Sequence, residues 1–100
     1  MKELSNSQLT EMIRKRAADT GNVVLTKHAK SRMKLRKITE AEVHATLRNG
    51  RLEDPPELAP NGGLTATMAY FYAGRKIGVV VGLVETDGLP VVTVLCIKQR

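Results

Sequence analysis

The sequence predicts an α+β domain of two layers, in which three helices precede an antiparallel meander of strands. Up to Gly50, apolar residues recur at helical spacing and each segment has its own start signal. After Gly50 the pattern changes to three apolar runs separated by turn residues, at 64–72, 76–85 and 91–97. A chain of 100 residues with 42% hydrophobic residues has the size and composition of one globular domain.

The three predicted helices each begin at residues that can accept hydrogen bonds from the first backbone amides. The N-cap candidates are Ser5 or Ser7 for the first helix, Thr26 for a second over about residues 27–36, and Thr39 with Glu42, as a capping box, for the third. Gly21 stops the first helix and Gly50 closes the third, because glycine commonly ends helices.

The sequence of the second half of the chain predicts strands. Residues 51–54 fit a short strand, and the Pro- and Gly-rich segment 55–63 is a loop that continues neither helix nor strand. Asp87 and Gly88 form a strong hairpin signal between the last two runs. Both of these runs are apolar on two faces, so we expect central strands that helices cover on one side.

Positive charge is concentrated in one quarter of the chain. The net charge is +6, and residues 14–37 contain nine Lys or Arg against one acid, Asp19, whereas the remaining residues carry seven bases and nine acids. Concentrated positive charge attracts polyanions and is the usual footprint of nucleic-acid binding. The alternative is a solvated helical face that contributes solubility, but such a face usually mixes its signs.

Several classes of protein are disfavoured. The first residues lack the apolar region of a signal peptide, and no apolar run is long enough to cross a bilayer. Cys96 is the only cysteine and forms no intrachain disulfide, so we expect a small buried side chain in a cytoplasmic protein without membrane contact. With His28 and His44 as the other nitrogen or sulfur ligands, neither a metal site nor a cofactor is expected.

One stripe of the second helix could carry chemistry. His28, Arg32 and Arg36 follow at intervals of four residues and therefore share one side of the helix. An imidazole transfers protons near neutral pH, and guanidinium groups bind phosphate oxygens in pairs. Metal-free RNA cleavage needs both functions. Alternatively, the histidine packs near the helix start while the two arginines pair with glutamates.

The pattern H-A-x-x-R-M-x-x-R-x-I-T-x-x-x-V-x-x-x-L-x-x-G, from His28 to Gly50, followed by a final strand with VVTVL, resembles a bacterial family known as domain of unknown function 4258. That family is grouped with the RelE-like toxins of the barnase, EndoU, colicin and RelE superfamily. The resemblance implies N-terminal helices packed on a four-stranded antiparallel sheet at residues 23–100, with residues 1–22 as an additional helix. It also implies a metal-independent, toxin-type ribonuclease that cleaves RNA by attack of the 2′-hydroxyl.

The expected site combines residues that match the family motif with others inferred from charge and aromatic character. The expected catalytic residues are His28, Arg32, Thr93 and Tyr72, and the expected nucleic-acid-binding residues are Lys27, Lys30, Lys34, Arg36, Lys37, Arg14, Lys15, Arg16 and Tyr70. RelE toxins rely on a C-terminal tyrosine, whereas this chain has no tyrosine after Tyr72. Tyr70 and Tyr72 share a strand face, where they can stack on bases, supply a phenol or simply pack.

Two other hypotheses remain open. The chain could be a non-catalytic binding module, or a phage or mobile-element inhibitor, whose basic helix engages nucleic acid or a nucleoprotein complex. It could also be an accessory protein whose positive patch docks an acidic protein. The expected partners are RNA or another nucleic acid and, by the resemblance and by charge, an acidic antitoxin or immunity protein.

Overall fold

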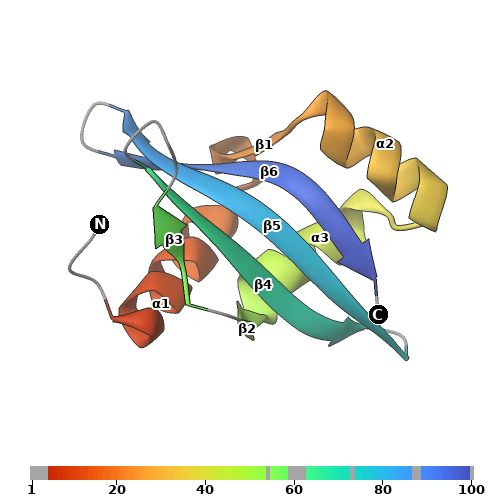
Figure 1. Cartoon of the computed structure of the whole chain (residues 1–100), viewed down its shortest axis with the longest axis horizontal. Helices are drawn as coiled ribbons and strands as arrows, with labels where there is room; N and C mark the ends of the chain where they lie inside the picture. The colour runs from red at the N-terminus through yellow and green to blue at the C-terminus, as the bar shows by residue number, and fades with distance from the viewer. Residues whose placement is uncertain (1–4, 54, 59–62, 73, 87–88, 100) are drawn as a thin grey trace.

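The computed structural model describes residues 5–53, 55–58, 63–72, 74–86 and 89–99, and it confirms an α+β architecture. Within these residues, three α-helices pack against a mixed sheet of six strands (Figure 1). Helices α1 and α3 lie behind the sheet in this view, and α2 lies beside β6. We call the sheet face turned away from α1 and α3 the open face.

Each helix begins at an N-cap residue that the sequence predicted. Their bounds are α1 (Asn6–Ala17), α2 (Lys27–Arg36) and α3 (Glu40–Asn49), with Ser5, Thr26 and Thr39 as N-caps. The hydroxyl of Thr26 accepts a hydrogen bond from the Ala29 amide at 3.1 Å. Thr39 and Glu42 form the expected capping box. A short 3-10 helix at Thr20–Asn22 follows α1. Local hydrogen bonds of the caps therefore explain all three helix starts.

The strands are β1 (Val23–Leu25), β2 (Arg51–Leu52), β3 (Glu57–Leu58), β4 (Leu64–Tyr72), β5 (Arg75–Thr86) and β6 (Leu89–Gln99). They lie in the order β1-β6-β5-β4-β2, and β3 pairs with β4. The predicted antiparallel meander of β4, β5 and β6 is confirmed. The hairpin turn expected at Asp87 and Gly88 lies outside the described residues.

The expected four-stranded, wholly antiparallel sheet is wrong in strand number and in direction. β1 pairs in parallel with β6, with Val23 opposite Val92, and β3 forms within the segment predicted as a loop. The reason is that an open strand edge leaves backbone donors and acceptors unpaired. β1 pairs with the edge of β6, whereas β2 and β3 pair with two parts of the edge of β4.

The hydrophobic core lies between the helices and one sheet face. Alternate residues of the meander point into it, as the period of a strand requires. The fully buried hydrophobic residues are Leu9, Ile13 and Ala17 of α1, Ala29 of α2, Val43 and Leu47 of α3, and Met68, Ile77, Val79, Val81, Leu83, Val92, Val94 and Ile97 of the sheet. The helix at residues 6–17, expected as an addition, therefore shares its core with the rest of the chain.

Gly50 allows α3 to end directly against β4. A Cβ atom at this position would lie 2.4 Å from the Thr46 carbonyl oxygen and 2.6 Å from that of Ala69. Both obstacles are backbone atoms and cannot rotate away. The glycine is thus required by close approach of two backbones rather than by its dihedral angles, since its φ is −78°.

A charged pair ties the junction of α2 and α3 to the start of β5. Glu42 is buried, and its carboxylate accepts hydrogen bonds from Thr39 and from the Arg75 guanidinium. The same guanidinium donates to the Lys37 carbonyl at 3.4 Å. Burial by itself raises the pKa of Glu42, but the hydrogen bond from Thr39 and the hydrogen bond and charge of Arg75 outweigh burial and lower it.

We expect Gly50→Ala to destabilise the protein by about 2–3 kcal/mol, because the added methyl group overpacks against two fixed carbonyls. Urea unfolding followed by circular dichroism measures the change. Gly21→Ala is the control, since its Cβ would meet only the side chain of Asp19, at 3.2 Å. Equal, small effects of the two substitutions would contradict this explanation.

We expect Glu42→Gln to destabilise the protein by about 2 kcal/mol at pH 7, because it keeps the capping box but removes the charge that Arg75 binds. Since the folded-state pKa is lowered, the carboxylate contributes stability above its ordinary value of 4.5, and this contribution is lost as pH falls below that value. Urea midpoints at pH 7 and pH 4 measure it. The variant should lose less stability than wild type on acidification, and identical pH profiles would count against the pair.

Candidate nucleic-acid interface

The position of α2 is set by its N-cap. Thr26 directly follows β1, and both its amide and its hydroxyl donate to the Val94 carbonyl of β6, at 3.3 Å and 2.8 Å. The same hydroxyl accepts from the amide of Ala29. One side chain therefore caps the helix and fixes its start to the sheet, so α2 packs along β6 (Figure 1).

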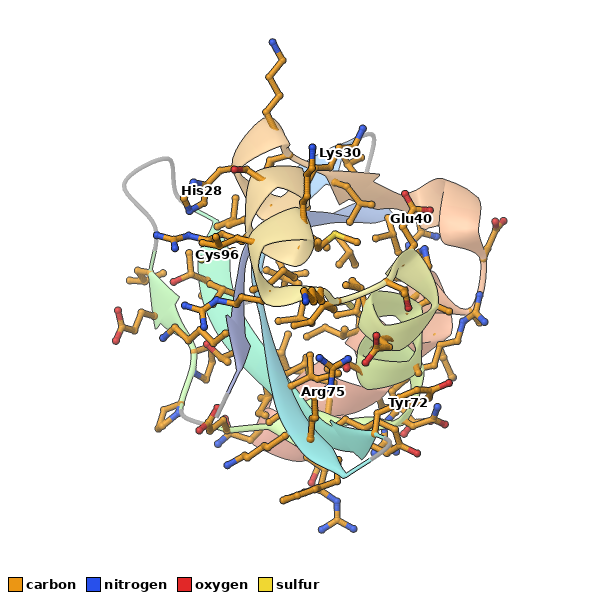
Figure 2. All side chains as sticks on the ribbon, turned by 90° about the vertical axis from the view of Figure 1, so that its right-hand side faces the viewer. His28, Lys30, Glu40, Tyr72, Arg75 and Cys96 are labelled. Carbon is orange, nitrogen blue, oxygen red and sulfur yellow. The ribbon has the colours of Figure 1, made fainter. Side chains whose placement is uncertain are left out.

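The stripe predicted on α2 lies beside its buried face. Ala29 and Met33 point into the core. His28 and Arg32 directly precede these two buried residues, and Arg36 follows Arg32 by one turn on the same flank. Arg32 and Arg36 are half-buried, whereas His28 is exposed. Figure 2 shows His28 and Cys96 on the same side of α2, with Lys30 on another side. The flank thus faces the open side of β6.

The open face of β6 beside this flank carries small and polar side chains. Thr93 lies between Val92 and Val94, which are fully buried, so its side chain points to the open face. A β-bulge follows, because Val80 pairs with Cys96 while Val81 pairs with Val94.

Leu95 is the extra residue of the bulge and lies over Gly82, where a Cβ atom would be 3.3 Å from its Cδ1. Cys96, next to the fully buried Ile97, is a half-buried free thiol on the open face rather than the buried side chain expected. Thr93 lies opposite Val24 of β1, the edge strand that α2 follows, so Thr93 and the helix that carries His28, Arg32 and Arg36 lie near the same edge of the sheet.

The cations of this flank have no anionic partners among the described residues. α2 contains no acidic residue, and within the described part of the chain no carboxylate lies within 4.0 Å of Arg32 or Arg36. The Nε atom of Arg36 is buried without a hydrogen-bond acceptor among these residues. A buried donor without a partner costs about 1–3 kcal/mol.

The tyrosines do not join this edge. Tyr72, expected as a catalytic residue, ends β4 opposite Arg75 and is 39% exposed. Figure 2 shows it well away from His28, toward the opposite end of the sheet. Tyr70 pairs with the buried Ile77 and is itself half-buried. A phenol for proton transfer, one of the roles open to Tyr72, is therefore not placed beside the histidine, and the second proton-transfer group stays unassigned.

The other cations expected to bind nucleic acid divide into two groups. The exposed lysines of α2 and its C-cap surround the remaining sides of the helix: Lys27, Lys30, Lys34 and Lys37. On α1, Lys15 is exposed and Arg16 is half-buried with a partner of its own. Arg14 is used by the fold, since its guanidinium donates to the carbonyls of Asn49 and Gly50.

The contacts of Arg14 and Arg48 could not be inferred from the sequence. Arg48 of α3 donates to the carbonyls of Ala17 and Ala18, while Arg14 of α1 donates to the end of α3, so each arginine caps the other helix. Cations favour helix C-termini because the helix dipole is negative there. The position of each arginine near the end of its own helix can be read from the sequence. The helix whose carbonyls it binds is determined by tertiary packing.

Within the described residues, no group of three or more His, Cys, Asp and Glu side chains is placed to hold a metal ion. Among the same residues, no helix is both long and apolar enough to cross a membrane.

Comparison with known proteins gives one match. The model of a family described as "Domain of unknown function (DUF4258)" matches residues 25–95, from the end of β1 to the bulge of β6. The match contains α2, α3, β4 and β5 and leaves α1 outside. No curated protein and no solved structure is significantly similar to the chain.

We expect Thr26→Ala to destabilise the protein by about 1–2 kcal/mol, because it removes the cap of α2 together with the bond to Val94. Thr26→Ser keeps the hydroxyl and should retain most of this stability. Thermal and urea unfolding of both variants measure the difference. A serine variant as unstable as the alanine variant would show that the hydroxyl does not anchor the helix.

Proposed function

We propose that this chain, which belongs to the DUF4258 family, is a small RelE-like ribonuclease that binds RNA along α2 and the open face of β6. It cleaves the strand without a metal ion, by attack of a ribose 2′-hydroxyl on the adjacent phosphorus. His28 transfers the proton, and Arg32 and Arg36 bind the phosphate.

One observation carries this proposal: an imidazole and two guanidinium groups share a flank that has no carboxylate among the described residues. Cations that stabilise a fold usually have partners, as Arg14 and Arg75 do here. Cations without carboxylate partners among the described residues favour a ligand rich in oxygen acceptors. Phosphate groups have this chemistry, and guanidinium binds them with two parallel hydrogen bonds.

The reaction follows from these groups. The neutral imidazole of His28 takes the proton of the 2′-hydroxyl, and the 2′ oxygen forms a new bond to phosphorus. Arg32 and Arg36 stabilise the additional negative charge of the phosphorane. The bond from phosphorus to the 5′ oxygen then breaks, and that oxygen takes a proton from a water molecule at the exposed His28. The imidazolium gives its proton to the hydroxide that is left, so the water molecule and the neutral imidazole are restored. The products are a 2′,3′-cyclic phosphate and a 5′-hydroxyl.

A protein partner forms part of the proposal. An acidic antitoxin or immunity protein would match the charge of α2, in which Lys27, Lys30 and Lys34 are exposed beside the catalytic flank. Complementary charge accelerates association and excludes competing partners. Such a partner would compete with RNA for the same helix.

A second candidate function is binding without cleavage. It is favoured by the position of Tyr72, which lies far from His28 (Figure 2). The imidazole therefore has no tyrosine beside it that could act as a second proton-transfer group. In that case the helix engages nucleic acid or a nucleoprotein complex through charge alone. Affinity then depends steeply on salt and does not depend on His28.

We expect His28→Ala to lower the rate of RNA cleavage by about 10²- to 10⁴-fold, because it removes a positioned proton-transfer group. The assay uses a generic RNA in EDTA with analysis of the product ends, and filter binding on the same samples. RNA affinity should change little, since the exposed imidazole contributes little to the charge of the helix.

His44→Gln is the matched control, because His44 lies on α3 and is half-buried. It should retain both cleavage and binding. RNA binding by wild type without any cyclic phosphate product would reject catalysis and leave the binding module. Absence of both binding and cleavage would reject both functions.

A further inference from the structure

A second polar and aromatic surface lies at the other edge of the sheet. A pocket of about 310 Å³ opens between the end of α3 and the end of β4. Tyr70 and Phe71 supply its aromatic surface, Arg51 and Lys76 its charges, and Asn49 an amide. This volume is at the lower limit of small-ligand pockets, which occupy about 300–1,000 Å³. β2 and β6 lie at different positions in the sheet, so this pocket is separate from the flank of α2.

Phe71 is the most unusual feature of this pocket. Its side chain is 70% exposed, although an aromatic ring is costly to leave in water. Its strand edge is also open among the described residues, because β2 pairs with β4 at Met68 and Ala69 and not beyond. An exposed ring beside unpaired backbone can stack on a flat aromatic ligand.

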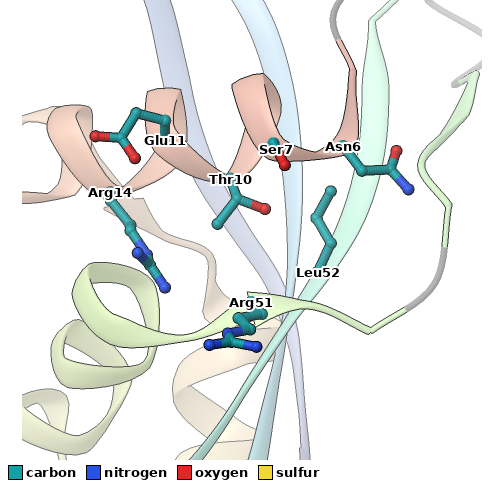
Figure 3. Close-up of a pocket in the computed structure, with 7 residues that line it drawn as sticks. All are labelled: Asn6, Ser7, Thr10, Glu11, Arg14, Arg51 and Leu52. Atoms are coloured by element: carbon teal, nitrogen blue, oxygen red, sulfur yellow. The ribbon is translucent and has the colours of Figure 1, made fainter.

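Arg51 connects this pocket to a second hollow, of about 360 Å³, between α1 and β2. Figure 3 shows Ser7 and Thr10 on the α1 side of the hollow and Arg51 on the β2 side, with Glu11 pointing away from Arg51. Arg51 is exposed, and no carboxylate among the described residues lies within 4.0 Å of it. By contrast, the Lys76 Nζ atom lies 3.4 Å from a Glu53 oxygen.

We propose that this edge is a nucleotide-binding subsite, in which a base stacks on Phe71 and its phosphate binds Arg51. The hydroxyls of Ser7 and Thr10 are further donors for phosphate oxygens in the hollow that Arg51 shares (Figure 3). The side-chain amide of Asn49 donates to the Ala45 carbonyl at 3.1 Å and keeps its own oxygen as an acceptor for a base edge.

The combination of groups favours a nucleotide over other ligands. A simple anion would use Arg51 and leave the ring of Phe71 exposed, and an apolar ligand would leave the guanidinium without a partner. A nucleotide provides a π-face and a phosphate together. The nucleotide can be a free mononucleotide or one unit of a single strand. The subsite goes beyond the proposed function, because it does not require α2 to bind or cleave RNA.

The test is a titration of the isotopically labelled protein with AMP and, separately, with a short single-stranded oligo(A), followed by amide NMR. We expect both ligands to shift amides at residues 49–52 and 69–72. Phe71→Ala should weaken binding of the ligand by about 5- to 100-fold, since base stacking on an aromatic side chain contributes this much. Phe71→Tyr should restore it. Leu58→Ala is the matched control, because Leu58 is 62% exposed on a neighbouring strand.

Arg51→Gln should also weaken binding and reduce its salt dependence, because it removes the charge that faces the phosphate. Shifts with the oligonucleotide but not with AMP would assign the subsite to single strands. Shifts confined to α2 and β6 with either ligand would overturn the subsite and leave the proposed function standing. Shifts at residues 49–52 and 69–72 without RNA cleavage would keep the subsite and overturn the ribonuclease.

Discussion

The parallel pairing of β1 with β6, continued by the bonds from Thr26 to Val94, is the constraint on which the candidate site depends. It brings a segment from the first third of the chain to the edge of the last strand. α2 then has to start at that edge, and its flank lies on the open side of β6. Without this pairing, the start of α2 would not lie next to the part of β6 that contains Thr93. The fold therefore positions the site through backbone and cap bonds rather than through contacts of the functional groups.

The charge on α2 is unfavourable for the isolated helix. Lys27 and Lys30 lie near its positive N-terminus, and its first turn has no acidic residue to offset them. Repulsion among the cations adds to this cost, and only Ala29 and Met33 are buried on the helix. In the free protein, the N-cap of α2 and its core contacts offset the unfavourable helix dipole and the repulsion among the cations. A bound polyanion would offset them directly, which is the physical reason for assigning the helix a binding role. Arg14 and Arg48 represent the opposite case, because carbonyls of a neighbouring helix already satisfy them.

Local features of the sequence predicted the local structure well. Thr26, Thr39 and Glu42 identified two helix starts because caps depend on residues only three positions apart. The strand at 64–72 was predicted with its bounds because alternation and turn residues are also local. The parallel β1 and β6 pair was not predicted, since no local signal specifies a partner about 70 residues away.

Because the sequence does not specify contacts between distant segments, Tyr72 was expected in the same site as His28, and Arg14 was expected to bind nucleic acid. The stripe of α2 was predicted because one helix carries all of it, whereas the subsite at Arg51 and Phe71 joins separate segments.

The most direct test of phosphate binding by the flank of α2 is the salt dependence of RNA affinity for two charge-matched double variants. One variant combines Arg32→Gln with Arg36→Gln, and the other combines Lys30→Gln with Lys34→Gln. If the flank binds phosphates, the arginine variant should flatten the slope of log K against log salt by about 0.7 for each lost contact. The lysine variant should change it less. Equal changes in the two variants would contradict a site on this flank and leave only diffuse attraction to a basic helix.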